Sequence, residues 1–157
     1  MTIILTKSDR KKTIIAQSLD QIKTDLAYRL PASEKRILLV DDSIEVRFSL
    51  RRILRSAGIH QINGTNNGVA AIQMVLNMAQ NDTPYHVVIL DYMMPGLTGM
   101  EILDEIRQSG VPGTEKTRFI FLTGFRDQQL EDAARIAGAA FILDKPCNTT
   151  KLMAAIG

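Results

Sequence analysis

Residues 87–99 read VVILDYMMPGLTG, an apolar run that passes into a single carboxylate, Asp91, and then into a loop rich in proline and glycine. A short apolar run of this kind is typical of a buried strand. Three more apolar runs end in polar residues: 37–40 is followed by Asp41 and Asp42, 119–122 by Thr123, and 141–143 by Asp144 and Lys145. The carboxyl ends of parallel strands meet at one crevice, where ligands of α/β proteins bind. We therefore expect an acidic trio, a hydroxyl and a lysine to share one pocket.

The composition indicates a single soluble domain of 157 residues, of which 45% are hydrophobic and 23% charged. This length is sufficient to bury a real core. We find no apolar run long enough for a signal peptide or a membrane span, so we expect a cytoplasmic protein without membrane contact. The single cysteine, Cys147, is interpreted as a packing residue, and His60 and His86 as parts of local structure rather than metal ligands.

Positive charge is concentrated near the N-terminus. Residues 1–36 contain eight Lys/Arg and four Asp/Glu, a net charge of +4, whereas residues 37–157 contain eleven and thirteen, a net charge of −2. In the N-terminal segment the basic residues alternate with acidic ones, as on an ordinary solvated helix face. We therefore do not expect nucleic-acid binding.

The rest of the chain alternates between short apolar runs and segments of helical periodicity, which predicts repeated β-α units around a parallel sheet and an α/β fold. We expect strands near 36–41, 59–63, 86–91, 118–123 and 140–144. We expect helices near 44–57, 68–80, 99–109, 127–137 and 149–156. Gly58, Gly110 and Gly138 each lie where a helix should end in a residue of positive φ.

The polar residues at the strand ends closely resemble those of the receiver domain of two-component response regulators. The anchors are Asp41-Asp42, Asp91 in a D-x-x-M-P-x-x-x-G loop, Thr123, and Lys145-Pro146. The resemblance covers about three quarters of the chain and implies a doubly wound, five-stranded parallel sheet of the flavodoxin-like type, with strand order 2-1-3-4-5. An N-terminal helix would precede it. We expect a helical extension and linker in residues 1–35 and the receiver domain in residues 36–157.

The resemblance also implies the chemistry. Asp91 would accept a phosphoryl group from a phosphohistidine of a histidine kinase or a histidine phosphotransfer protein. Mg²⁺ would be held by Asp42, Asp91 and the backbone carbonyl of Met93, with Asp41 acting through a metal-bound water; hard oxygen ligands of this kind suit Mg²⁺. Lys145, whose peptide bond to Pro146 is commonly cis in this family, would contribute positive charge, and the hydroxyl of Thr123 would bond the phosphoryl group.

Two departures from the family pattern affect signalling. Three positions before Lys145, where many receivers have a switching aromatic residue, this chain has Ile142, and its aromatic residue, Phe141, lies one position earlier on the opposite face of the strand. A bulge would re-aim Phe141; otherwise Ile142 or another route would carry the response. The large apolar residues Met93 and Phe125 could exclude water from the acyl phosphate, which predicts slow autodephosphorylation.

The surface of the chain offers two further predictions. Arg47, Arg51 and Arg55 form a basic stripe on the first helix of the domain, a face that often docks the phosphodonor in this family, although exposed arginines at this spacing are also ordinary. In the extension, an apolar stripe follows 4-3-4 spacing between about residues 8 and 30: Ile15, Leu19, Ile22 and Leu26. The last helix is short, so we expect the extension to cover the domain or to form a homodimer.

Three functions remain open at this stage. The expected one is a response regulator, not an enzyme, that catalyses only its own phosphorylation and dephosphorylation and then switches an unknown downstream partner or relays phosphate. The second is a Mg²⁺-dependent phosphatase of the haloacid-dehalogenase type, but those enzymes have their nucleophile on the first strand in an Asp-x-Asp pattern. The third is an interaction module that does not depend on phosphorylation.

Overall fold

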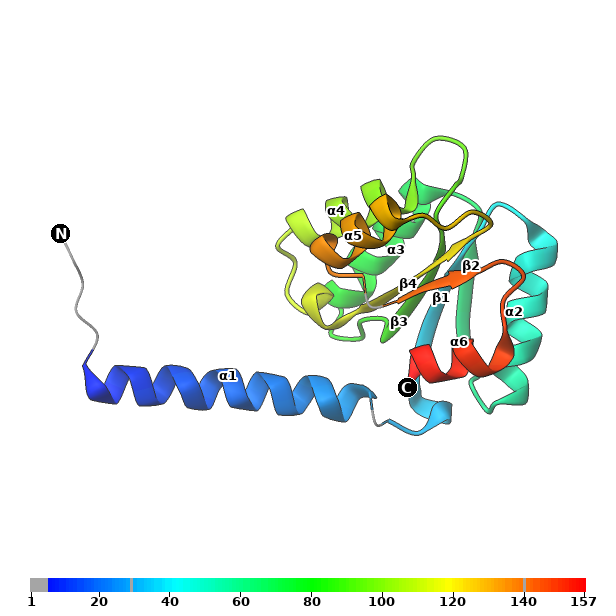
Figure 1. Cartoon of the computed structure of the whole chain (residues 1–157). Helices are drawn as coiled ribbons and strands as arrows, with labels where there is room; N and C mark the ends of the chain where they lie inside the picture. Colours follow the sequence, from blue (N-terminus) through cyan, green and yellow to red (C-terminus); the bar gives the residue numbers. More distant parts are fainter. Residues whose placement is uncertain (1–5, 29, 140) are drawn as a thin grey trace. The chain divides into compact units, whose positions relative to one another are not determined.

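We describe the protein from a computed structural model, which describes residues 6–28, 30–139 and 141–157, with residues 23–28 described by their backbone alone. Its contacts divide the chain into two compact units, Met1–Leu30 and Pro31–Gly157. The first unit contains one helix, α1 (Lys7–Tyr28) (Figure 1). In the part of the chain that is described, no helix combines the length and the apolar character needed to cross a membrane.

The second unit alternates strands and helices, as the sequence predicts. Its elements in order are η1 (Ala32–Glu34), β1 (Arg36–Val40), α2 (Ile44–Ser56), β2 (Gln61–Thr65), α3 (Gly68–Gln80), β3 (Val87–Asp91), α4 (Gly99–Gln108), η2 (Thr114–Lys116), β4 (Arg118–Thr123), α5 (Gln128–Ala137), β5 (Phe141–Asp144) and α6 (Thr149–Ile156). All strand pairs are parallel and the order is β2-β1-β3-β4-β5, so the predicted doubly wound sheet is confirmed.

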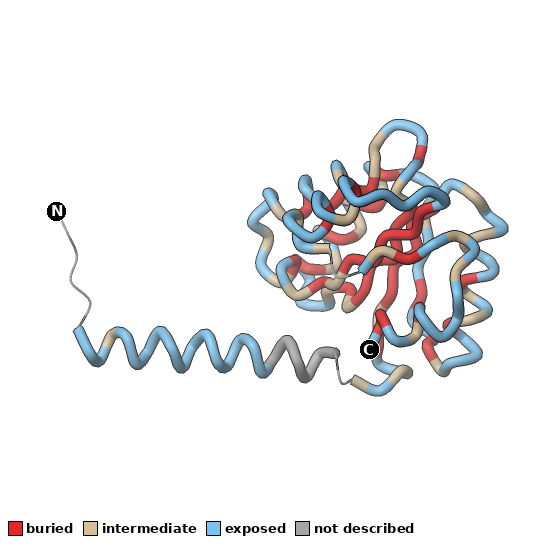
Figure 2. Tube along the Cα trace, viewed as in Figure 1, coloured by how far each residue is buried: buried red, intermediate tan, exposed pale blue. Residues whose placement is uncertain are grey.

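Helices cover both faces of the sheet. Leu50 of α2 and Leu152 of α6 pack on one face, and Val75 of α3, Leu103 of α4 and Ala134 of α5 pack on the other (Figure 1). Strands β1, β3 and β4 are buried along nearly their whole length (Figure 2). Burial on both faces explains why their sequences are almost continuously apolar.

The α-helices α2 to α6 of the second unit each begin at a side chain that caps the helix. Ser43, Asn67, Thr98, Asp127 and Asn148 all accept a hydrogen bond from a backbone N–H of the first turn. Such caps satisfy donors that have no partner inside the helix. The caps fix where the loops above the sheet end and the helices begin.

One strand lies two residues later than the sequence predicts. Strand β2 begins at Gln61 rather than at Ile59. Gly58, with φ of 85°, ends α2 in the left-handed conformation, and the N–H of Ile59 then donates to the carbonyl of Leu54. Ile59 is fully buried but closes the helix instead of pairing with β1. Positive φ is also found at Gly110 and Gly138, as predicted.

The helix of the first unit presents an apolar face. Ile15, Leu19 and Ile22 are exposed by 56%, 51% and 52% in the single chain. The fourth predicted position, Leu26, lies outside the described side chains. This face can therefore be buried only against another surface.

Candidate functional site

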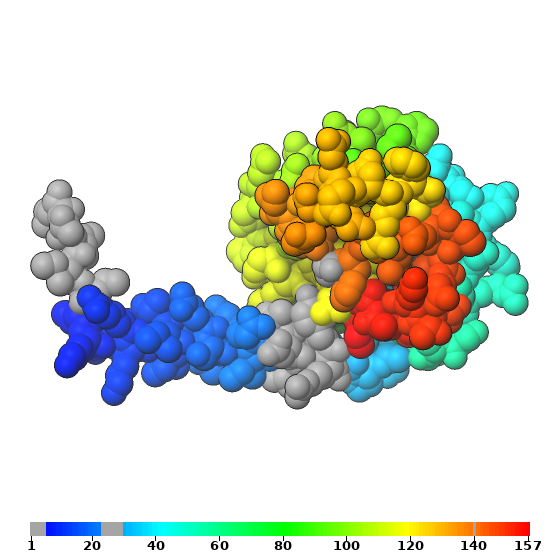
Figure 3. All heavy atoms as spheres, in the orientation of Figure 1, coloured from blue at the N-terminus to red at the C-terminus, as the bar shows by residue number. Residues whose placement is uncertain are grey.

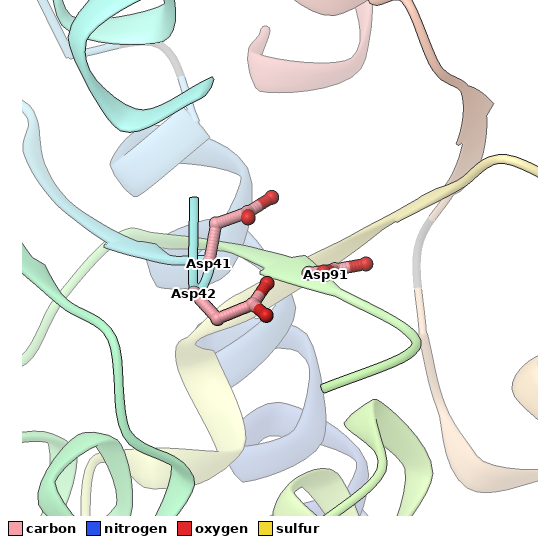
Figure 4. Close-up of side chains that lie close together, drawn as sticks. All are labelled: Asp41, Asp42 and Asp91. Carbon is pink, nitrogen blue, oxygen red and sulfur yellow. The ribbon is translucent and has the colours of Figure 1, made fainter. Parts of the chain in front are cut away.

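Three carboxylates meet at the carboxyl end of the sheet. Asp41 and Asp42 directly follow β1, and Asp91 is the last residue of the neighbouring strand β3. Each offers one oxygen, and these three oxygens lie within 4.8 Å of one another (Figure 4). Asp41 and Asp91 are buried, whereas Asp42 is exposed. The sequence prediction that the acidic trio shares a pocket agrees with this arrangement.

A lysine from the other side of β4 reaches the same pocket. The Nζ of Lys145 lies 2.8 Å from Oδ2 of Asp41 and 3.2 Å from Oδ1 of Asp91. The backbone N–H of Lys145 donates to the carbonyl of Thr123, and the peptide bond to Pro146 is cis. One ammonium group therefore bridges the two buried carboxylates.

The charges and the burial of the pocket shift the pKa values of Asp91 and Lys145. Burial raises the pKa of Asp91, and the negative charge of Asp41 raises it further, while Lys145 and the N–H of Met93 act in the opposite direction. Burial acts to lower the pKa of Lys145, but the hydrogen bond and charge of Asp41, together with those of Asp91, outweigh it and raise that pKa. The lysine stays charged, and it only partly relieves the crowding of the carboxylates.

The carboxylates of Asp41 and Asp91 are each fixed by a backbone N–H two residues later in the chain. Ser43 N–H donates to Oδ1 of Asp41 at 2.9 Å, and Met93 N–H donates to Oδ1 of Asp91 at 3.2 Å. Each bond closes a local turn in the loop immediately after a strand. The second places Met93 beside Asp91, and the resemblance predicts its carbonyl as a metal ligand.

Arg47 is a member of the site that sequence reasoning missed. The sequence groups it with Arg51 and Arg55 on a basic stripe, but its Nη1 donates to the backbone carbonyl of Asp41 at 2.6 Å. The guanidinium therefore supports the loop that carries the acidic pair. The only indication of this contact in the sequence is that Arg47 lies six residues after Asp41, near the start of the following helix.

Thr123 is buried beside the site, and its hydroxyl is engaged locally. The hydroxyl donates to the carbonyl of Phe125 at 2.7 Å and accepts from the N–H of the same residue at 3.1 Å. Next to it is a hollow of about 660 Å³, lined in part by Thr123, Met93 and Phe125. Met93 and Phe125 are exposed by 69% and 77%, so both large apolar residues line this hollow and are open to solvent.

The two residues considered for switching lie on opposite faces of β5. Strand β5 pairs with β4 residue by residue, with Phe141 opposite Ile120 and Ile142 opposite Phe121, so no bulge re-aims Phe141. Ile142 packs against the core on the side of α3, α4 and α5. Phe141 is 42% exposed, and the guanidinium carbon of Arg118 lies 5.7 Å from its ring centroid.

The donor set suits a hard divalent cation. Three carboxylate oxygens within 4.8 Å of one another form a compact, negatively charged group, and Asp42 is open to solvent, so coordinating waters have access. Mg²⁺ prefers one or two carboxylates together with waters and phosphate oxygens. These residues could therefore hold a metal ion of this type.

Comparison with known proteins agrees with the fold. The family model of the response regulator receiver domain matches residues 37–157. A probable chemotaxis protein CheY from Rhizobium etli is 33% identical over 125 residues, which are 80% of this chain and 92% of that protein. The response regulator MprA from Mycobacterium leprae is 38% identical over 122 residues, 77% of this chain but 49% of that regulator, so this chain spans about half of the longer relative.

Solved structures show the same fold. The complex of CheX, CheY, BeF3 and Mg²⁺ from Borrelia burgdorferi matches with a TM-score of 0.68 and 25% identity, over 78% of this chain and 86% of that one. The receiver domain of the histidine kinase CKI1 from Arabidopsis thaliana, complexed with Mg²⁺, matches with a TM-score of 0.67 and 24% identity, over 78% and 92%.

The fold and the acidic site thus define a signal-transduction module of two-component systems. The chain belongs to the response regulator receiver domain family. The haloacid-dehalogenase alternative is not favoured, because the candidate nucleophile lies on β3 and the carboxylates after β1 are adjacent.

Proposed function

We propose that the protein accepts a phosphoryl group from a phosphohistidine onto Asp91 and thereby switches the binding of a partner or relays the phosphoryl group. The observation that carries the proposal is the bridge from Lys145 to Asp41 and Asp91 beside the exposed carboxylate of Asp42. A carboxylate nucleophile, a fixed cation and a cluster of oxygen ligands are the parts that such a transfer needs.

In the proposed reaction, an oxygen of Asp91 forms a bond to phosphorus as the P–N bond of the donor breaks. The bonding electron pair stays on the imidazole nitrogen, which then takes a proton from solvent. The ammonium of Lys145 is already 3.2 Å from Asp91 and supplies positive charge to the phosphoryl oxygens. Thr123 is proposed to bond one of these oxygens after its hydroxyl leaves Phe125.

Mg²⁺ fits the donor set, and we propose Asp41, Asp42, Asp91 and the carbonyl of Met93 as the residues that hold it. When bound, it would offset the negative charge of the carboxylates and of the phosphoryl oxygens. Asp91 and Asp42 would bind it directly, and Asp41 through water, while Asp41 also keeps Lys145 in place through their 2.8 Å contact.

The proposed partners are a histidine kinase or a histidine phosphotransfer protein as donor, and a downstream protein as target. The chain would act in the cytoplasm and catalyse only its own phosphorylation and dephosphorylation. We assign residues 36–157 to the receiver domain and residues 1–35 to a helical extension with its linker. This division agrees with the extent of the family match.

Mass spectrometry of the intact protein tests the acceptor role. The protein is incubated with Mg²⁺ and phosphoramidate, a small phosphodonor that carries a P–N bond. A mass gain of one phosphoryl group is expected for the parent and for Asp144→Asn, an exposed strand-end carboxylate, and no gain for Asp91→Asn. Equal labelling of Asp91→Asn and the parent would refute the proposal.

We also propose that the apolar face of α1 pairs with the same face of a second copy. Ile15, Leu19 and Ile22 follow the spacing of a helix-pairing seam and are all more than half exposed. Light scattering tests this: Leu19→Asp should reduce a dimer to a monomer, whereas Ser18→Asp, one position away on the helix, should not. A monomeric parent would contradict the pairing without affecting the acceptor site.

A further inference from the structure

The loop that follows Thr123 is held at both ends by short hydrogen bonds. At its start, the Thr123 hydroxyl bonds both the carbonyl and the N–H of Phe125. At its end, Oδ1 of Asp127 accepts the N–H of Leu130 at 2.7 Å and caps α5. Arg126 lies between these two anchors, so the position of its side chain is tied to the conformation of the loop.

The guanidinium of Arg126 connects this loop to two other elements. Its Nε lies 2.6 Å from Oε1 of Glu131 on α5, and its Nη2 donates to the backbone carbonyl of Ile142 on β5 at 2.8 Å. Its Nη1 lies 3.7 Å from Oδ2 of Asp144, at the end of β5. The planar fork of arginine can make these contacts together, which a lysine could not do. In Figure 3 the loop and α5, yellow to orange, lie at the surface beside the orange-red segment that contains the end of β5 and α6.

These contacts join the two residues that are proposed to touch the phosphoryl group. Thr123 is linked to Arg126 through Phe125, and Lys145 directly follows Asp144. For Thr123 to bond a phosphoryl oxygen, its hydroxyl proton must leave the carbonyl of Phe125. The loop then loses the hydrogen bond that ties its start, while the contacts of Arg126 with Glu131 and Ile142 still hold its middle in the present conformation.

We propose that Arg126 is a positioning residue that holds the loop after β4 in the conformation where Thr123 is bonded to Phe125, and so restrains phosphoryl acceptance at Asp91. The inference rests on the proposed function. Any contact made only in the resting conformation shifts the equilibrium away from the reactive one. The Arg126 contacts are partly exposed, so their removal shifts that equilibrium by about three- to tenfold.

The test compares Arg126→Gln with Arg135→Gln. Arg135 also lies on α5, but its guanidinium contacts Asp132 of the same helix, at 3.4 Å. The first measurement is the solvent exchange of the Phe125 amide proton by NMR, without Mg²⁺ or phosphodonor. We expect exchange about three- to tenfold faster in Arg126→Gln and unchanged in Arg135→Gln. Unchanged exchange in Arg126→Gln would overturn the inference.

The second measurement is the rate of phosphorylation by phosphoramidate in Mg²⁺. We expect Arg126→Gln to react several-fold faster than the parent, with Arg126→Lys between the two and Arg135→Gln equal to the parent. A purely structural role would lower the melting temperature without raising this rate. An unchanged or slower rate in Arg126→Gln would overturn the restraint on acceptance. If the parent itself took no phosphoryl group, the proposed function would fail, and the Phe125 exchange would still decide whether Arg126 holds the loop.

Discussion

The Nζ of Lys145 lies 3.2 Å from Oδ1 of Asp91, although Lys145 follows β5 and Asp91 ends β3, two strands that are separated by β4. The lysine crosses the end of β4 because it directly follows its strand, at the edge where all parallel strands of the sheet end. The same ammonium binds Asp41 at 2.8 Å. This crossing brings a cation into a pocket of three carboxylates, and the predictions below depend on the balance of those charges.

Replacing Lys145 should remove most of the phosphoryl acceptance. In Lys145→Met the phosphoryl oxygens lose their fixed positive charge, and the loss of one such group lowers rates by roughly a hundredfold. The measurement is the initial rate of phosphorylation by phosphoramidate in Mg²⁺. Lys151→Met, on the exposed side of α6, is the control and should react like the parent. A Lys145→Met rate within twofold of the control would contradict the assigned role.

Neutralising Asp91 should stabilise the protein when no metal is bound. The pKa of Asp91 is raised in the folded state, first by burial and then by Asp41, so its charged form is disfavoured by folding. The stability linked to a raised carboxyl pKa is present at low pH and is lost as the pH rises through the folded pKa. Asp91→Asn should therefore raise the free energy of unfolding at pH 7 in EDTA, on the order of 1 kcal/mol. Urea unfolding measures this, and a less stable Asp91→Asn would refute the account of the charges.

Asp42 should matter for the metal and not for the fold. Its carboxylate is exposed, so Asp42→Asn should change the metal-free stability by less than about 0.5 kcal/mol. A ligand that binds only the folded state raises the melting temperature by mass action, so Mg²⁺ should raise that of the parent. This increase should be much smaller in Asp42→Asn. Calorimetry measures both melting temperatures. If Mg²⁺ raised the melting temperature equally in the parent and in Asp42→Asn, Asp42 would not be a ligand of the metal.

The lifetime of the phosphorylated state should depend on Met93. Met93 is 69% exposed and lines the same hollow as Phe125 and Thr123, so we expect this apolar residue to limit the access of water to Asp91. Met93→Asn should lose phosphate several-fold faster than the parent. The decay of the phosphorylated species after removal of the donor measures the lifetime. Met100→Asn, on α4, serves as the control, and equal decay of Met93→Asn and parent would argue against slow autodephosphorylation by this route.

Acid sensitivity should arise in part at His86. Its Nδ1 accepts the N–H of Arg36 at 2.9 Å, and burial, followed by the charges of Arg36 and Lys35, lowers its pKa to about 4. A depressed folded pKa gives stability that is present above the unfolded value, about 6.5, and is lost as the pH falls toward 4. Because the ring is only half buried, we expect this loss to be about 1 kcal/mol.

Melting temperatures between pH 7 and pH 4.5 would reveal this contribution. The fall over this range should be shallower in His86→Asn than in the parent. His60→Asn, at an exposed position before β2, should follow the parent. If the melting temperatures of His86→Asn and the parent fell equally with pH, His86 would not contribute to the acid sensitivity.

The elements of the fold were predictable where burial and local chemistry decide them. The apolar runs of β1, β3 and β4 identify strands that are buried on both faces, and Gly58, Gly110 and Gly138 have the positive φ that helix ends require. The start of β2 was not predictable from hydrophobicity, because burial of Ile59 serves the end of α2 rather than strand pairing.

The site was predictable to a similar extent. Residues at the ends of parallel strands meet for reasons of topology, so the pocket of Asp41, Asp42, Asp91 and Lys145 follows from their places in the sequence. The contact of Arg47 with the backbone of Asp41 depends on side-chain conformation in three dimensions. The same holds for the three contacts of Arg126, whose partners lie on α5 and β5, and spacing in the sequence does not show them.

The most direct test of the central claim is to locate the phosphoryl group by reduction. The protein is treated with phosphoramidate and Mg²⁺, reduced with borohydride, which converts an aspartyl phosphate to homoserine, and digested for tandem mass spectrometry. We predict homoserine at position 91 and aspartate at positions 41, 42 and 144. Unmodified Asp91, or homoserine at another of these positions, would contradict the assignment of Asp91 as the phosphoryl acceptor.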